Sequence, residues 1–280
     1  MQVNVQNGRI YVARDGKGSP ALLLHGVPDS AELWQPVIDG IRDHYTCYAP
    51  DLPGFYRSQV PSGFDYSLEG YATFVKDLLD ALGIEQPVTL ILHDWGGIFG
   101  MAFACLYPER VSRIVGGSFP FSHLYQWHPW ARVWQTPVLG ELSMAMMNEP
   151  LFRWEIQRGS QRLDKSQIHA MYAGRATRPE TRNSVLRLYR SMPPRRFQPW
   201  QSRVELLARK VPIDLVWGAD DPYVPTYQGR LLHPRRMHVV PECGHWVPAE
   251  APEAIIAAVL ETDIPETTAQ RTAEQASENA

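Results

Sequence analysis

The first half of the chain alternates short apolar runs with segments of helical periodicity, and the alternation returns near the C-terminus. Near-continuous apolar runs of roughly 4–8 residues are typical of strands buried on both faces of a sheet. Helical spacing is clearest over residues 66–82, where Ser67 can cap the helix, and further helices are expected at 30–43 and 252–261. The predicted strands are residues 21–24, 45–49, 88–92, 111–115, 213–217 and 237–240. This order predicts an α/β protein with a mostly parallel sheet covered by helices on both faces.

Residues 120–210 differ in composition from the segments on either side. Weak strand patterning there is accompanied by five of the nine tryptophans: Trp127, Trp130, Trp134, Trp154 and Trp200. We expect a helical cap in this segment, inserted into a core formed by residues 1–119 and 211–264. The remaining residues, 265–280, are polar and lack aromatics, which is typical of a flexible tail. An Asn7-Gly8 pair near the start predicts a hairpin turn.

The composition narrows the possible partners. A net charge of −3 and a pI near 6.3 argue against binding to nucleic acid or to an acidic membrane surface. No apolar run approaches the ~20 residues that span a bilayer, and the N-terminal residues lack a signal-peptide pattern. The three cysteines are widely spaced and form no metal-ligand pattern. We therefore expect a reduced, cytoplasmic protein that uses neither metal nor cofactor.

Polar residues follow several of the predicted strands. The carboxyl ends of parallel strands meet at one edge of a sheet, which is where ligands bind in open α/β folds. Three of these residues, Asp94, Asp221 and His245, can serve as nucleophile, acid and base. Asp94 stands where an apolar strand runs into a glycine-opened helix, in the stretch LILHDWGG. The alternative interpretation of Asp94 is a helix N-cap.

Four motifs in chain order make the sequence resemble the α/β-hydrolase fold family from about residue 3 to residue 261. They are HGVP, HDWGG, WGADDPYVP and ECGHWVPAEAPE. The resemblance implies an eight-stranded, mostly parallel sheet with a helical cap (lid) insertion. It also implies a nucleophile elbow at Asp94, followed along the chain by the acid and then the histidine.

The resemblance assigns roles to particular residues. Asp221 would be the acid of the triad, with Asp220 as the alternative, and His245 would activate water. The backbone N–H groups of Val27 and Trp95 would form an oxyanion hole. Loop support would come from His25, Gly26, Pro28 and His93. One departure from the family pattern is Leu92, because a small residue is usual two positions before the nucleophile. Histidines without a surrounding motif, His128 among them, are interpreted as structural.

An aspartate at the elbow changes the expected chemistry. A carboxylate is nucleophilic at neutral pH without a general base, and its attack on an sp3 carbon gives an alkyl-enzyme ester. Family members with this residue are mainly epoxide hydrolases and haloalkane dehalogenases. The expected partners are therefore a small apolar organic substrate and water.

The leaving group separates these two activities. An epoxide oxygen needs an acid such as a tyrosine hydroxyl, whereas a halide needs N–H donors. Val27, where many dehalogenases have Asn, and the segment around Tyr189 favour epoxide hydrolysis. Tyr125 or Tyr172 could supply a second hydroxyl, and a lid indole such as Trp154 could bind a halide. A haloalkane dehalogenase, or a non-hydrolytic binding protein or oxygenase on the same fold, remains the alternative. The sequence leaves the substrate, the pocket size and the oligomeric state open.

Overall fold

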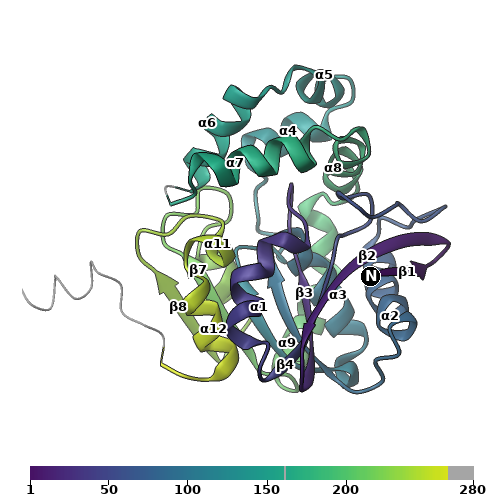
Figure 1. Cartoon of the computed structure of the whole chain (residues 1–280), viewed down its shortest axis with the longest axis vertical. Helices are drawn as coiled ribbons and strands as arrows, with labels where there is room; N and C mark the ends of the chain where they lie inside the picture. The colour runs from purple at the N-terminus through teal and green to yellow at the C-terminus, as the bar shows by residue number, and fades with distance from the viewer. Residues whose placement is uncertain (161, 264–280) are drawn as a thin grey trace, which may run out of the picture.

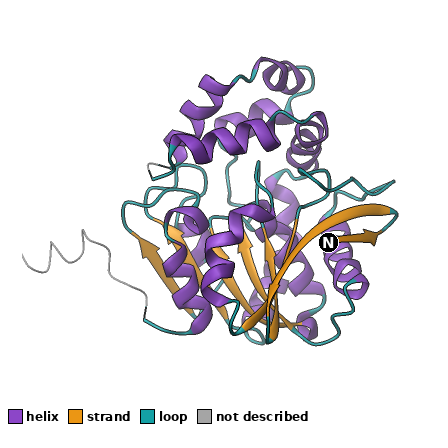
Figure 2. Ribbon diagram, in the orientation of Figure 1, coloured by secondary structure: helices purple, strands orange, loops and turns teal. Residues whose placement is uncertain are grey.

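A single eight-stranded sheet forms the centre of the computed structural model, which describes residues 1–160 and 162–263 (Figures 1 and 2). The strand order is β1-β2-β4-β3-β5-β6-β7-β8; β1 and β2 pair antiparallel with their neighbours, and all other pairs are parallel. The strands are β1 Gln2–Val5, β2 Gly8–Gly16, β3 Ser19–Leu24, β4 Tyr45–Pro50, β5 Val88–His93, β6 Val111–Gly117, β7 Ile213–Gly218 and β8 Arg236–Val240. The predicted mostly parallel α/β sheet is confirmed.

Helices cover both faces of this sheet. On one face α1 packs against α12, and on the other α3 packs against both α2 and α9. These helices are α1 Gln35–Ile41, α2 Leu68–Ala81, α3 Trp95–Leu106, α9 Gln201–Ala208 and α12 Pro252–Leu260; shorter helices are η1 Ala31–Trp34, η2 Pro108–Arg110, α10 Tyr227–Arg230 and α11 Val247–Glu250. The two faces bury separate apolar clusters, so the sheet is apolar on both sides as its strand sequences predict.

The segment between β6 and β7 forms a helical cap over one end of the sheet (Figure 1). Its elements are α4 Pro129–Gln135, α5 Leu139–Met146, α6 Glu149–Gly159, α7 Lys165–Met171, the π-helix η3 Tyr172–Ala176, α8 Pro179–Ser191 and the 3-10 helix η4 Pro194–Trp200. By packing, α9 belongs with the core, because it contacts α3. The bounds 120–210 for the cap stay a prediction, and the predicted tail at 265–280 lies outside the described residues.

Local sequence signals explain most element boundaries. The Ser67 hydroxyl accepts the Gly70 N–H at 2.9 Å and begins α2, as its sequence predicts. The N-terminal turn differs from the prediction by one residue. Val5 pairs with Gly8, and the two turn residues with positive φ are Gln6 (50°) and Asn7 (64°), so Gly8 is already in β2. No helix in the described part of the chain is long and apolar enough to cross a membrane.

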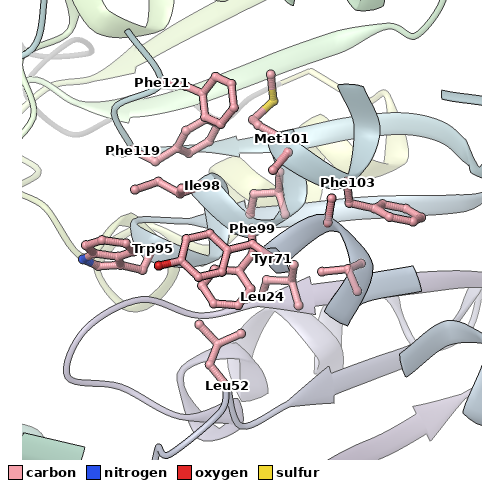
Figure 3. Packing of buried hydrophobic residues seen from close by; sticks show 14 of the residues in the cluster. Leu24, Leu52, Tyr71, Trp95, Ile98, Phe99, Met101, Phe103, Phe119 and Phe121 are labelled. Atoms are coloured by element: carbon pink, nitrogen blue, oxygen red, sulfur yellow. The ribbon is translucent and has the colours of Figure 1, made fainter. Parts of the chain in front are cut away.

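The hydrophobic core around Trp95 is rich in aromatic side chains. Figure 3 shows Trp95, Tyr71 and Phe99 side by side, with the Tyr71 and Phe99 rings stacked at 4.1 Å. The bulky Leu92 fits on β5 because α3 has Gly100 opposite it. A Cβ at Gly100 would lie 2.4 Å from a Leu92 methyl carbon. Gly100 on the facing helix therefore compensates for Leu92 at a position where a small residue is usual. Trp95 is then a rigid neighbour of Asp94.

Candidate active site

Asp94 occupies a strained turn between β5 and α3. Its backbone has φ 47° and ψ −124°, a region that non-glycine residues rarely adopt. Two glycines permit this turn: a Cβ at Gly26 would lie 2.3 Å from the Asp94 Cβ, and one at Gly96 would lie 2.0 Å from the Leu24 carbonyl oxygen. The Asp94 side chain makes no helix-capping hydrogen bond. The turn therefore presents the carboxylate rather than capping the helix.

The Asp94 carboxylate is buried, with 6% of the residue exposed. Burial raises its pKa to about 6, against the opposing effects of the His245 charge and of the Val27 and Trp95 N–H groups. The Val27 N–H donates to Asp94 Oδ2 at 2.8 Å, and the Val27–Pro28 peptide is cis. The two N–H groups named from the sequence thus both act on one carboxylate.

His245 lies between this carboxylate and a second acid. Its Nδ1 is 2.9 Å from Asp221 Oδ2, and both side chains are almost fully buried. Asp221 Oδ1 accepts the N–H groups of Tyr223 and Val224 at 2.9 and 3.0 Å, which fixes the carboxylate. Asp220 is exposed. The geometry therefore joins Asp221, and not Asp220, to the histidine.

The two carboxylates control the charge of His245. Burial alone would lower its pKa, but the Asp221 charge and hydrogen bond, together with the Asp94 charge, outweigh burial and raise the pKa to about 9. For Asp221, burial acts to raise the pKa, and the His245 charge and hydrogen bond lower it below its ordinary value. The directions of these pKa shifts favour an imidazolium beside two carboxylates at neutral pH.

The loop histidines brace the site in the neutral form. Burial lowers the pKa of His25 to about 4 and that of His93 to about 3. His25 Nε2 accepts the Leu52 N–H at 2.9 Å, and His93 Nε2 contacts the His245 carbonyl oxygen at 2.9 Å. Each ring ties one loop of the site to a neighbouring loop.

A cavity of about 100 Å³ opens between the core and the cap, above Asp94 and His245. Its walls are mainly apolar, and the charged residues Glu155 and Arg182 also line it. The aromatic lining residues are Tyr125, Trp127, Trp130, Trp134, Phe152, Tyr189, Tyr223 and Trp246. The cap provides most of these side chains and the sheet loops provide the carboxylate and imidazole. The arrangement suits an uncharged organic molecule, because burying an unpaired charge there would be costly.

Tyr189, on α8, lines the same cavity as Asp94 and is 4% exposed. Burial and the Asp94 charge raise the pKa of its hydroxyl well above 10. The Trp95 indole N–H lies near enough to the phenol oxygen to oppose this rise, yet it reaches hydrogen-bond geometry with no described residue. Trp95 does not line the cavity, because Tyr189 and Trp127 pack against its ring.

His128 is a neighbour of Tyr189 that the sequence interpretation missed. Its Nδ1 accepts the Ala131 N–H at 3.3 Å and so caps α4, which leaves the proton of the neutral ring on Nε2. Nε2 is 3.4 Å from the Tyr189 hydroxyl and donates to its oxygen. Burial lowers the His128 pKa to about 3, so the ring stays neutral. Its position directly before Pro129 at a helix start was the available signal.

Of the other candidate cap residues, one lines the cavity and two do not. Tyr125 lines it, but its hydroxyl already donates to the Tyr223 carbonyl oxygen at 2.9 Å. Tyr172 packs on Phe152 outside the cavity lining, and its hydroxyl donates to the Met147 carbonyl oxygen at 3.4 Å. Trp154 is 55% exposed and packs under Arg158. The assignments of Tyr172 and Trp154 to the pocket are therefore wrong in this geometry.

The chain is similar in sequence to several known proteins. A family described as "alpha/beta hydrolase fold" matches residues 20–140. The cis-3-alkyl-4-alkyloxetan-2-one decarboxylase of Shewanella oneidensis is 27% identical over 272 residues, covering 90% of this chain and 84% of that protein. Haloalkane dehalogenase 2 of Mycobacterium bovis is 29% identical over 272 residues, covering 91% of each. Epoxide hydrolase 3 of Xenopus tropicalis is 28% identical over 275 residues, covering 88% of this chain and 71% of that protein.

A solved structure extends the comparison to the whole fold. Cfl2 from Burkholderia cenocepacia superposes with a TM-score of 0.80 at 21% identity, covering 93% of this chain and 94% of that one. The similarity includes both the sheet and the inserted helices by its coverage, and it concerns the fold alone.

Proposed function

Since this chain is an enzyme of the α/β-hydrolase fold, we propose that it opens epoxides to vicinal diols through a covalent ester on Asp94. The observation that carries the proposal is that a strained, buried carboxylate and a protonated tyrosine line the same apolar cavity. A carboxylate can attack an sp3 carbon directly, which a serine at this turn could do only with a base.

In the first step one Asp94 oxygen attacks a ring carbon and the carbon–oxygen bond of the epoxide breaks. The Val27 N–H holds the other oxygen, Oδ2, at 2.8 Å, so the carboxylate has a fixed orientation for attack. Tyr189 gives its proton to the departing oxygen. His128 donates into the Tyr189 oxygen, which leaves the phenol proton free to be directed to the substrate.

Before the second step the imidazolium gives its proton to the phenolate of Tyr189 that the first step leaves. Neutral His245 then takes a proton from water, and the resulting hydroxide attacks the ester carbonyl carbon. Esterification removes the negative charge of Asp94, one of the charges that raise the His245 pKa, so the imidazolium loses its proton more readily and the neutral base becomes available at that stage. The Val27 and Trp95 N–H groups stabilise the oxyanion. Collapse of the tetrahedral intermediate releases the diol and the Asp94 carboxylate, His245 keeps the proton taken from water, and the sum is epoxide plus water to diol.

Haloalkane dehalogenation is the second candidate, because Trp134 lines the cavity and its indole N–H has no hydrogen-bond partner in the described part of the chain. A buried unpaired N–H is suited to a weakly hydrated anion such as bromide. Against this, Trp95 lies behind Tyr189, so its indole N–H is shielded from the cavity. Epoxide hydrolysis uses the groups that do face the cavity.

The deciding experiment is a parallel assay of the wild type with styrene oxide, 1,2-dibromoethane and a 3,4-dialkyl oxetan-2-one. We expect diol from styrene oxide. Bromide release without diol from a range of epoxides would replace the proposal by dehalogenation. Alkene and carbon dioxide from the oxetanone alone would replace it by the reaction named for the Shewanella relative. Preference for small carboxylate substrates would contradict the apolar-substrate expectation.

The covalent step has its own test in His245→Gln. This variant should accumulate the ester, and intact-mass spectrometry should show Asp94 heavier by one styrene oxide. Asp94→Ala is the matched control and should carry no adduct and show no turnover. Full turnover by Asp94→Ala would exclude Asp94 as the nucleophile.

A further inference from the structure

Asp29, in the loop after the cis peptide, is a buried carboxylate that the proposed mechanism does not use. It is 1% exposed. One oxygen, Oδ2, accepts the indole N–H of Trp246 at 2.9 Å, and the other, Oδ1, accepts Arg175 Nη1 at 3.2 Å. Trp246 directly follows the triad histidine, and Arg175 belongs to the π-helix of the cap. A single carboxylate therefore joins three segments: the Val27 loop, the histidine loop and the cap.

Trp246 transmits this constraint to His245. Its ring meets the imidazole edge to face, with centroids 5.0 Å apart and planes at 89°. The indole can rotate only if it loses its bond to Asp29, so the Asp29 carboxylate fixes one wall of the imidazole pocket. An unpaired buried carboxylate or indole N–H would be costly, which favours the bonded arrangement.

The cap also holds the histidine loop from a second direction. The His245 N–H donates to the carbonyl oxygen of Gly159, the last residue of α6, at 2.7 Å. This approach requires Gly244, because a Cβ there would lie 2.0 Å from that oxygen. A Cβ at Gly159 would lie 2.6 Å from the Trp246 ring. The end of α6 thus packs on both His245 and Trp246, whereas Arg175 of η3 is linked to Trp246 through Asp29.

We propose that Asp29 is a positioning residue for His245, acting through Trp246, and that Arg175 couples this positioning to the seating of the cap. The inference rests on the proposed function for its kinetic consequence. His245 is needed to activate water but not to form the Asp94 ester. Loss of the Asp29–Trp246 bond should therefore slow ester hydrolysis more than ester formation.

The kinetic test uses Trp246→Phe, which removes the indole N–H and keeps an aromatic ring, together with Asp29→Asn. The rates of ester formation and of ester hydrolysis are both measured by quenching single turnovers of styrene oxide and recording intact-protein mass spectra. We expect hydrolysis to slow between about 10-fold and about 10²-fold, the range that small misplacement of a reacting group causes, with ester formation changed by less than about twofold. Wild-type hydrolysis in Trp246→Phe, or equal losses in both steps, would overturn the proposal.

A second readout needs no substrate. Hydrogen exchange of the Trp246 indole N–H, followed by NMR, reports directly on its bond to Asp29. We expect exchange at least about tenfold faster in Arg175→Met, partial recovery in Arg175→Lys, and no change in Arg178→Met, an exposed arginine of the same cap segment. Unchanged exchange in Arg175→Met would disprove the coupling to the cap. If the wild type forms no adduct at all, the proposed function fails, while this exchange measurement still decides the linkage.

Discussion

The polar groups around the cavity differ in their hydrogen-bond pairing between the core and the cap. In the core, the Asp94 carboxylate, the Asp221 carboxylate and the His245 imidazole each have at least one fixed partner. In the cap, Trp134 lines the cavity and its indole N–H has no partner among the described residues, and the Tyr189 hydroxyl has a long 3.4 Å contact with His128. In the proposed mechanism each core group serves a reaction step, whereas the cap groups are those that would contact the substrate.

This difference suggests a division in which the core determines the type of reaction and the cap determines the choice of substrate. Backbone turns and strand ends position the core groups, so the geometry belongs to the fold. The cap groups lie on helix faces. Substitution of a single helical residue therefore changes which hydrogen-bond donor reaches the leaving group. Relatives named as an epoxide hydrolase, a haloalkane dehalogenase and an oxetanone decarboxylase, all below 30% identity to this chain, fit this division.

The largest expected effect tests the core. Asp221→Asn should lower turnover by about 10⁴-fold, because an amide cannot stabilise the imidazolium and favours the wrong tautomer. Steady-state diol formation measures the loss, and folding is checked by circular dichroism. Asp220→Asn, one residue away and exposed, is the matched control and should retain wild-type activity. A comparable loss in Asp220→Asn would mean that the acid has been misassigned.

The sequence could predict the core groups because each follows a strand within a motif. Asp94, Asp221 and His245 are separated along the chain, but parallel strands bring their carboxyl ends together. No comparable rule predicts from the sequence which cap residues face the cavity. Trp154 and Tyr172 lie on helices whose buried faces depend on packing, and the structure turns both away from the cavity. His128 was missed because its partner, Tyr189, lies 61 residues further along the chain.

The next effect tests the cap. Tyr189→Phe should slow formation of the Asp94 ester from styrene oxide by about 10²–10⁴-fold, the usual range for loss of a general acid. Rapid-quench mass spectrometry measures the rate. Hydrolysis of an ester already formed should change little, because that step uses His245. Equal slowing of both steps would show that the tyrosine supports the fold rather than the leaving group.

A pH profile compares the two regions in one protein. The nucleophile must be ionised, and the pKa of Asp94 is raised to about 6, so ester formation should fall about tenfold for each pH unit below 6. Its rate should be flat above about pH 7 until Tyr189 ionises, far above 10. Single-turnover ester formation between pH 4 and 9 is the measurement. An ester-formation rate that stays constant down to pH 4 would contradict the raised pKa.

The smallest effect separates two roles of one cap residue. His128 caps α4 through Nδ1 and donates to Tyr189 through Nε2. His128→Asn keeps a good N-cap but is too short to reach the phenol, so stability should hold while ester formation slows by about tenfold, the value of one hydrogen bond. His128→Ala should show the same slowing and also lose about 1 kcal/mol in the free energy of unfolding. Urea unfolding and single-turnover rates measure the two effects, with the exposed His123→Ala as control. If His128→Asn forms the ester at the wild-type rate, the Nε2 contact has no catalytic consequence and Tyr189 acts as an acid without it.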